Sequence, residues 1–319
     1  MKKQRLSQIL MVFLSLFILI GCGKDDEFPP YKRNDNAYQL AINLDGSLQN
    51  PAFSPDGESI VFTRFKNGYN EEPADIYVFN LETSSLKQLV SDGTGNVNLP
   101  GSCWNETNES IVFSSSREPH DEIYMIDDNG SPGDEVQITD RDEYMAYEPT
   151  FSPNGQWIVF ESHPLDVEGQ GVITKYQTNK SGNYIALTDA SDDCRQPNWS
   201  PAGNLILYQQ YKNKQWDIWA MSLDGSNKRI VTPGPGDKTD ASFTSDGNSI
   251  VYSTDYDLEL ANIYKISING GEPERLTNCT GYDGAPSISP DGTKLVFESC
   301  QGDPDESSGT KIWLLEVSN

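Results

Sequence analysis

The only two histidines of this chain lie in acidic segments, Ser116-Arg-Glu-Pro-His-Asp-Glu122 and Phe160-Glu-Ser-His-Pro-Leu-Asp166. Imidazoles beside carboxylates can ligate a metal or move a proton, and a nearby arginine can grip a carboxylate. The alternative is that these side chains only hydrogen-bond neighbouring acids and fix the packing of their loops. The catalytic candidates are His120, His163 and Arg117. The metal-ligating candidates are His120, Asp121, His163 and Asp166.

A repeat that fills most of the chain must position these residues. Its first copy is Asn50-Pro-Ala-Phe-Ser-Pro-Asp-Gly-Glu-Ser-Ile-Val-Phe62, and the aromatic residue or isoleucine at the fourth position marks each copy. The markers recur every 44 to 51 residues, a period typical of propeller blades: Phe53, Trp104, Phe151, Trp199, Phe243 and Ile288.

Each repeat predicts four antiparallel strands. Ser-Pro-Asp-Gly sets the first turn because Pro fixes φ, Asp bonds back to the backbone and Gly accepts a positive φ. The second strand is β-branched and aromatic, as in Ile60-Val-Phe62, and the third carries a pair such as Ile76-Tyr77. A short outer strand such as Lys87-Gln-Leu-Val90 follows. Six such repeats predict an all-β, six-bladed propeller over residues 38–319.

The last repeat stops after its third strand, at Glu316-Val-Ser-Asn319, which would leave an unpaired sheet edge. Tyr38-Gln-Leu-Ala-Ile-Asn43 precedes the first hairpin as an outer strand precedes each later one. We therefore expect this segment to complete blade six and to close the ring. The strand directions place the Ser-Pro-Asp-Gly turns on the face opposite the channel-mouth loops, where we expect them to build the blade rather than a site.

The combination of Phe-Ser-Pro-Asp-Gly, Ile-Val-Phe, Ile-Tyr and Leu-Thr resembles the propeller repeats of TolB and its relatives over residues 38–319. The second hairpin departs, with Glu106-Thr-Asn108 in place of Pro-Asp-Gly. TolB is a periplasmic component of the Tol-Pal envelope system and binds the lipoprotein Pal through its propeller. The resemblance implies a propeller and a protein-binding role. Similar propellers include oligogalacturonate lyases with a histidine-rich metal site, for which two histidines are too few.

The N-terminus predicts an exported lipoprotein. Lys2, Lys3 and Arg5 precede a short apolar run, so residues 1–21 read as a signal peptide. Gly21 before Cys22 looks like a lipobox, with acylation at Cys22, and residues 22–37 form a tether. Lys24-Asp-Asp-Glu27 is similar to tags for transfer to the outer-membrane surface, although a plain solvated tether is the alternative. These features predict lipid attachment to the outer membrane, on its periplasmic side or at the cell surface.

The composition limits the partners. A formal net charge of −25 repels phosphate backbones, so nucleic acid is excluded as a partner. The acidic excess leaves a divalent cation as the one candidate cofactor. We expect a monomer.

Four cysteines remain apart from Cys22, without the close spacing of a zinc site. Export permits disulfides. Cys279 enters the sixth hairpin and Cys300 follows its second strand, so we predict a Cys279–Cys300 disulfide. Cys103 and Cys194 are expected to be buried or partly buried thiols.

The residues just before the inner strands form a predicted polar ring at the channel mouth: Asn50, Gly101, Glu148, Gln196, Asp240 and Ala285. Asn50, Glu148, Gln196 and Asp240 are the ligand-binding candidates, and a hydrated lining without a dedicated ligand is the alternative. The sequence favours a non-enzymatic scaffold that binds an envelope protein or a glycan. The alternative is a glycan-active lyase or hydrolase that uses the His120 and His163 loops.

Overall fold

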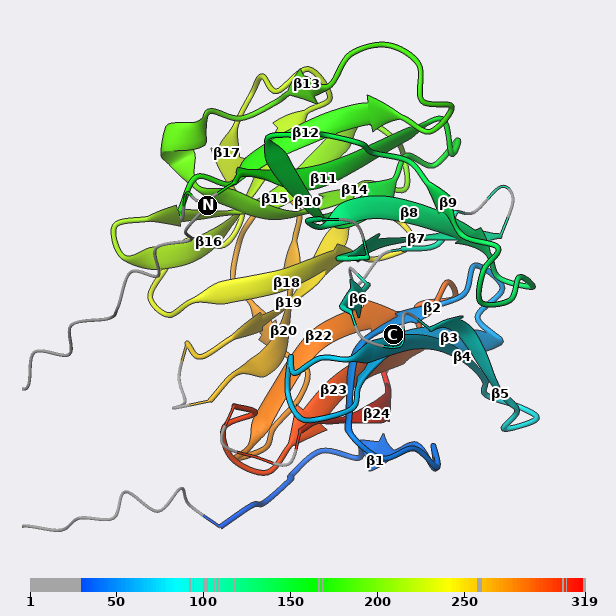
Figure 1. Cartoon of the computed structure of the whole chain (residues 1–319). Coiled ribbons are helices and arrows are strands. Elements are labelled where there is room, and N and C mark those ends of the chain that lie inside the picture. Colours follow the sequence, from blue (N-terminus) through cyan, green and yellow to red (C-terminus); the bar gives the residue numbers. More distant parts are fainter. Residues whose placement is uncertain are drawn as a thin grey trace, which may run out of the picture.

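The computed structural model describes residues 30–91, 93, 95–99, 103–105, 107, 109–117, 119–165, 167, 169–256, 260–305, 307 and 309–317. Within them, strands form six four-stranded antiparallel sheets, each one blade of a propeller (Figure 1). The predicted signal peptide, Cys22 and the first part of the tether lie outside the described residues. Among the residues described, no helix is long and apolar enough to cross a membrane.

Blades one to three follow the repeat order, from inner to outer strand. They are β2 (Ser47–Phe53), β3 (Ser59–Phe65), β4 (Ala74–Asn80) and β5 (Leu86–Ser91); β6 (Val97–Asn98), β7 (Ser110–Ser115), β8 (Glu122–Asp127) and β9 (Val136–Gln137); and β10 (Tyr144–Phe151), β11 (Trp157–Pro164), β12 (Val172–Gln177) and β13 (Ile185–Ala186).

A 3-10 turn, η1 (Ala190–Asp192), leads into blade four. The remaining blades are β14 (Cys194–Trp199), β15 (Leu205–Lys212), β16 (Gln215–Ser222) and β17 (Arg229–Ile230); β18 (Lys238–Phe243), β19 (Ser249–Thr254), β20 (Asn262–Ser267) and β21 (Glu274–Arg275); and β22 (Tyr282–Ile288), β23 (Lys294–Cys300), β24 (Lys311–Glu316) and β1 (Tyr38–Gln39).

The N-terminal strand closes the ring, as predicted. β1 pairs antiparallel with β24, with Tyr38 opposite Leu314 and Gln39 opposite Trp313. Strand β2 of blade one also packs against β22 and β23 of blade six. The edge of β24 is therefore covered by a strand from the other end of the chain.

Each blade is buried on both faces. Ile60, Val61 and Phe62 are consecutive in β3 and none is exposed to solvent. Successive side chains of a strand point to opposite faces, so β3 must lie between two apolar layers. This explains why the second strand of every repeat is a continuous apolar run rather than an alternating one.

The Ser-Pro-Asp-Gly turn is held by its own side chains. Ser54 Oγ donates to Asp56 Oδ1 (2.6 Å) and accepts the Ser59 N–H (2.9 Å). Asp56 also accepts the Glu58 N–H (2.9 Å), and these hydrogen bonds, that from Ser54 above all, lower the pKa of Asp56. Gly57 supplies the left-handed corner with φ of 73°. Equivalent side-chain hydrogen bonds recur in blades three, five and six: Ser152 with Asn154, Thr244 with Asp246, and Ser289 with Asp291.

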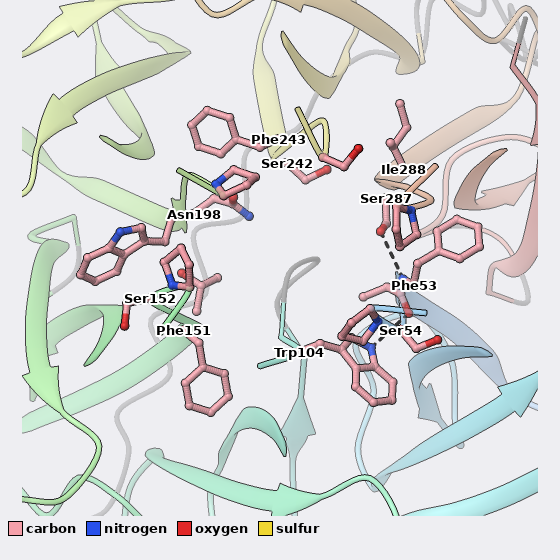
Figure 2. A pocket seen from close by; sticks show the side chains of 18 residues that line it. Phe53, Ser54, Trp104, Phe151, Ser152, Asn198, Ser242, Phe243, Ser287 and Ile288 are labelled. Carbon is pink, nitrogen blue, oxygen red and sulfur yellow. Dashed lines mark hydrogen bonds between the residues drawn. The ribbon is translucent and has the colours of Figure 1, made fainter. Parts of the chain in front are cut away.

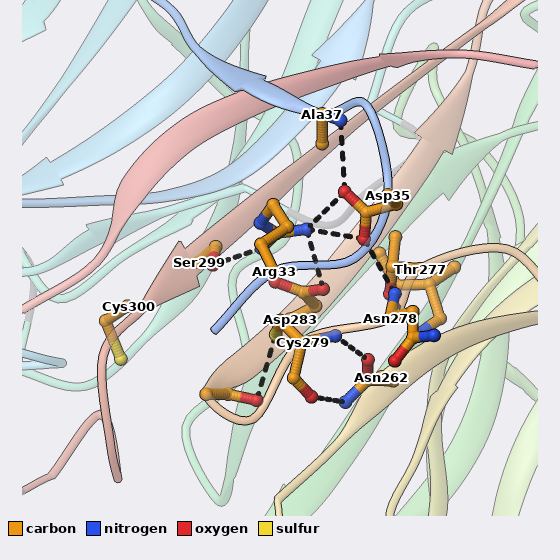
Figure 3. Close-up of polar contacts among 12 residues, drawn as sticks. Arg33, Asp35, Ala37, Asn262, Thr277, Asn278, Cys279, Asp283, Ser299 and Cys300 are labelled. Carbon is orange, nitrogen blue, oxygen red and sulfur yellow. Dashed lines mark hydrogen bonds and ion pairs between the residues drawn. The ribbon is translucent and has the colours of Figure 1, made fainter. Parts of the chain in front are cut away.

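Residues 30–37, which the sequence assigned to the tether, lie along blades five and six and pair with the loop before β22. Asn34 N donates to Asn278 O (2.8 Å), and Thr280 N donates to Lys32 O (3.0 Å). The Arg33 guanidinium is ion-paired with Asp283 and with Asp35 (Figure 3). This segment is part of the folded structure.

Arg33 is the anchor of that segment. Its side chain is 7% exposed and that of Asp283 is fully buried. The guanidinium also donates to Ser299 Oγ (3.0 Å) and lies 4.6 Å from the ring centroid of Trp313 and 5.4 Å from that of Phe297. The planar guanidinium of arginine can pair with carboxylates and stack on aromatic rings at the same time. A lysine ammonium group could not make both kinds of contact here.

The predicted Cys279–Cys300 disulfide is not formed. Both residues are thiols, and Cys279 Sγ donates to Gly281 O (3.2 Å) while Cys300 Sγ donates to Gly302 O (3.4 Å) (Figure 3). The prediction was wrong because Cys300 lies opposite Tyr282 in the β22–β23 register, whereas Cys279 pairs across the N-terminal segment with Arg33. Cys103 and Cys194 are buried thiols, as expected.

Replacing Arg33 by Met should lower the free energy of unfolding by about 3–5 kcal/mol, because Asp283 would be left buried without its cation. Urea denaturation followed by circular dichroism measures this change. Lys32→Met, at an exposed neighbour, is the matched control and should change stability by less than about 0.5 kcal/mol. Equal effects of the two substitutions would show that the Arg33 contacts contribute little.

Candidate functional site

A β-bulge at the same point of the inner strands of blades one, three, four, five and six builds the channel mouth. The register shifts between Gln49 and Ala52 in blade one, and at the corresponding positions of blades three to six. The residue within each bulge has a left-handed backbone: Asn50 (φ 52°), Glu148 (48°), Gln196 (45°), Asp240 (54°) and Ala285 (46°). These five residues surround one narrow cavity of about 30 Å³. The structure thus brings the predicted ring together, and Gly101 lies outside the described residues.

On one side of the mouth, a chain of hydrogen bonds links residues of four blades. Glu298 Oε2 accepts the Asn50 N–H (3.1 Å), and Asn50 Nδ2 donates to Asn98 Oδ1 (2.8 Å). Asn98 Nδ2 in turn donates to Glu148 Oε1 (3.3 Å). The bulge exposes the backbone N–H of Asn50 to the channel, where a carboxyl group of the neighbouring blade satisfies it.

The other side repeats this arrangement. Glu161 Oε2 accepts the Gln196 N–H (2.8 Å), and Gln196 Oε1 accepts the Asp240 N–H (3.0 Å). Gln196 Nε2 also donates to Asp240 Oδ1 (3.1 Å). Asn50, Glu148, Gln196 and Asp240 are therefore each tied to an adjacent blade, so the mouth forms only when the ring is assembled.

Four carboxyl groups, those of Glu148, Glu161, Asp240 and Glu298, share the mouth. Burial raises the pKa of Glu298 to about 8, and the nearby Asp240 charge adds to the effect. Burial raises the pKa of Glu148 well above its ordinary value, with the charges of Glu161 and Asp240 adding to it. With a pKa of about 8, Glu298 is mostly protonated at neutral pH, and burial favours the neutral form of Glu148 in the same direction.

The Glu298 carboxyl group is also held by two phenols. The Tyr69 and Tyr282 hydroxyls each lie 3.2 Å from Glu298 Oε1 and donate to it. Burial is the main cause that raises the pKa of both tyrosines, which keeps them protonated donors. Tyr69 was not singled out in the sequence because it lies between the repeated strands, in the loop between β3 and β4.

The two histidines have separate partners. His120 Nε2 lies 2.6 Å from Arg141 O and 3.4 Å from Glu122 Oε1. His163 Nε2 lies 3.2 Å from Glu161 Oε1, and its ring meets Tyr147 edge-on at 5.7 Å. Tyr147 donates to Asp121 Oδ2 (3.0 Å), so His163 and Asp121 are linked through a phenol.

Arg117 does not join either histidine. It forms an ion pair with Glu135 (3.2 Å) and stacks over Tyr124 at 4.8 Å. Asp166, a metal-ligand candidate, lies outside the described residues. Among the residues that are described, no three His, Cys, Asp or Glu side chains are close enough together to hold a metal ion.

A wider pocket of about 510 Å³ adjoins the mouth beside His163. Glu148 lines both cavities, and Tyr147, Glu161, His163 and Arg195 contribute polar atoms to the wider one. Arg195 pairs with Asp193 (3.3 Å) and lies over the Trp216 ring. Arg195 was not singled out in the sequence as a site residue. The only signal for its place in this pocket is that it directly precedes Gln196.

The repeat residues themselves form a second cavity, of about 470 Å³, at the turn end of the channel. Figure 2 shows the marker residues Phe53, Trp104, Phe151, Phe243 and Ile288 around it. Sequence reasoning assigned these positions only to the blade framework. It missed the cavity because all six blades contribute lining residues, so no single repeat shows it.

The six repeated blades around a central channel, with a cavity at each end, define this protein as a six-bladed β-propeller. The chain belongs to the family described as the TolB beta propeller domain, whose model matches residues 34–239 and 177–310. It is 31% identical over 186 residues to the Tol-Pal system protein TolB of Francisella tularensis subsp. mediasiatica, which covers 58% of this chain and 40% of that protein.

Solved structures share the fold. A putative TolB from Agrobacterium tumefaciens superposes with a TM-score of 0.65 at 19% identity, covering 76% of this chain and 84% of that chain. An oligogalacturonate lyase from Vibrio parahaemolyticus has a TM-score of 0.55 at 13% identity, covering 91% of this chain and 97% of that chain. At these identities the likeness shows the fold alone.

The buried Glu298 should make stability depend on pH. The folded state keeps the proton up to pH of about 8, whereas the unfolded carboxyl group loses it near its ordinary pKa of 4.5. Stability therefore falls as the pH rises between these values, by up to about 1.4 kcal/mol per unit. Glu298→Gln, which has no proton to lose, should gain stability relative to the wild type from pH 5 to pH 8 in urea denaturation. Parallel pH profiles of the two proteins would contradict the buried-proton assignment.

Proposed function

We propose that this protein is a lipid-anchored propeller of the cell envelope that binds a protein partner at its channel mouth. The observation that carries the proposal is the convergence of Asn50, Glu148, Gln196 and Asp240 from four blades on one polar cavity. Membership of the TolB propeller family supports it, and so does a curated relative named as a component of the Tol-Pal system. The chain spans 40% of the length of that relative, so the partner of this protein need not be the same.

The chemistry of the mouth favours a partner segment with hydrogen-bond donors. The carboxylates of Glu161 and Asp240 accept hydrogen bonds and leave lone pairs toward the channel, since each accepts from few groups. A peptide loop with Lys, Arg or free backbone N–H groups matches these acceptors. Arg195, at the edge of the adjoining pocket, would receive an acidic side chain of the same loop.

The lyase or hydrolase alternative has no comparable support. His120 and His163 are each occupied by a neighbouring oxygen atom, of Arg141 and Glu161 respectively. Arg117, the third member of that predicted set, pairs with Glu135. These contacts favour the binding role.

A pull-down tests the partner. Affinity-tagged full-length protein, extracted from membranes after cross-linking, should enrich one envelope protein identified by mass spectrometry. Arg195→Glu should reduce its recovery at least fivefold, because the reversed charge would repel the acidic side chain that Arg195 is proposed to receive. Lys180→Glu is the matched control, since it reverses a charge at an exposed turn after β12, on the opposite face, and recovery should not change. Identical recovery with both variants, or no enriched protein, would contradict the proposal.

Membrane attachment is tested separately. Cys22→Ala removes the proposed acylation site, so the protein should move from the membrane fraction to the soluble fraction after cell fractionation. The Cys279→Ala variant serves as the cysteine control, because Cys279 is a buried thiol of the propeller. A Cys22→Ala protein that stays with the membrane would show that another element holds it there.

A further inference from the structure

The cavity at the turn end of the channel has a composition unlike that of the rest of the protein. None of the 18 residues that line it is charged, although the chain carries a net charge of −25. The turn prolines Pro55, Pro153, Pro201 and Pro290 line it together with the aromatic marker residues. Its volume of about 470 Å³ lies within the range of ligand pockets, roughly 300–1,000 Å³.

A buried amide without a partner lies at the base of this cavity. Asn198 is 5% exposed and lines both this cavity and the mouth cavity, so the two meet at its side chain. Its carboxamide forms no hydrogen bond with any described residue, whereas buried polar side chains normally have partners. Figure 2 shows this side chain directed toward the cavity. Asn198 therefore offers two donors and an acceptor to a molecule in the cavity.

Hydroxyl groups at the equivalent positions of other blades extend this polar floor. Thr150 Oγ1 donates to Pro197 O (3.3 Å) and Ser242 Oγ donates to Pro286 O (2.8 Å), so both keep lone pairs free to accept. Ser287 Oγ accepts the Phe53 N–H (3.3 Å), so its own proton remains available. The floor thus mixes donors and acceptors without any charge.

We propose that this cavity binds a neutral sugar unit. A sugar ring has an apolar face for the proline and aromatic wall, and each of its hydroxyl groups both donates and accepts, as the floor requires. The Trp104 indole N–H is already donated to Ala52 O (3.4 Å), so its ring offers the ligand an apolar face. A charged ligand would find no counter-charge, and a hydrocarbon chain would leave Asn198 unpaired. This cavity meets the mouth cavity at Asn198, but it lies at the other end of the channel from the proposed protein-binding mouth.

Isothermal titration calorimetry and saturation-transfer NMR test the proposal on the full chain after signal removal. The probes are D-glucose, D-galactose, N-acetyl-D-glucosamine and maltose, with D-glucuronate and D-glucosamine as charged counterparts. At least one neutral probe should bind at millimolar concentration or tighter, and the charged counterparts at least tenfold more weakly. Equal or tighter binding of a charged counterpart, or no binding of any neutral probe, overturns the proposal.

Three variants locate the site. Ser245, the exposed serine that replaces proline in the turn of blade five, lines the cavity, so Ser245→Trp should weaken sugar binding at least tenfold by filling the entrance. Ala202→Trp is the matched control, at an exposed turn residue of blade four outside the lining, and should change binding less than twofold. Asn198→Leu should also weaken binding tenfold. If it does not fold, Ser245→Trp decides, and unchanged binding in Ser245→Trp overturns the proposal.

Discussion

The pairing of β1 with β24 is the contact on which the rest of this propeller depends. Tyr38 and Gln39 supply the outer strand that blade six lacks, which joins the two ends of a chain otherwise built by sequential hairpins. Because each blade packs between two neighbours, a missing closure would expose the apolar face of β2 against β22. Arg33 secures the same seam by its buried ion pair with Asp283. Closure is thus both a backbone pairing and an electrostatic contact.

The mouth depends on closure in a further way. Its bulge residues form their hydrogen bonds with neighbouring blades, as when the Asn50 N–H donates to Glu298 across the seam. A buried carboxyl group left without these donors would carry the full cost of its desolvation. The site and the ring therefore form together, and a blade in isolation would contain no site.

The sequence predicted the framework well because the framework is repeated. The period of the marker residues indicated six blades, and the missing fourth strand of the last repeat led to Tyr38 as the closing strand. Strand directions alone were enough to locate the polar ring at the mouth. The β-bulges were not predicted, because a left-handed backbone is usually signalled by glycine, whereas here it occurs at residues such as Glu148 and Ala285.

The remaining features could not be predicted because they arise between distant residues. Asn198 faces a cavity that exists only in the assembled channel, because residues of all six blades line it. The contact of Arg33 with Asp283 joins residues 250 positions apart in sequence. Proximity of Cys279 and Cys300 in the sequence pattern suggested a disulfide, but the register of β22 and β23 decides which side chains meet.

The docking of residues 30–37 on the propeller shortens the tether that would join the propeller to a lipid on Cys22. Under the proposed acylation, the chain from Cys22 to Pro30 can span at most roughly 28 Å, whereas a free tether to Tyr38 would reach about 55 Å. Pro30 accepts a hydrogen bond from Thr280, in the loop that enters β22 at the mouth end of the blade. The tether would therefore leave the propeller on the same side as the channel mouth. An anchored molecule would keep that mouth close to the bilayer, within reach of proteins that lie in or on the same membrane.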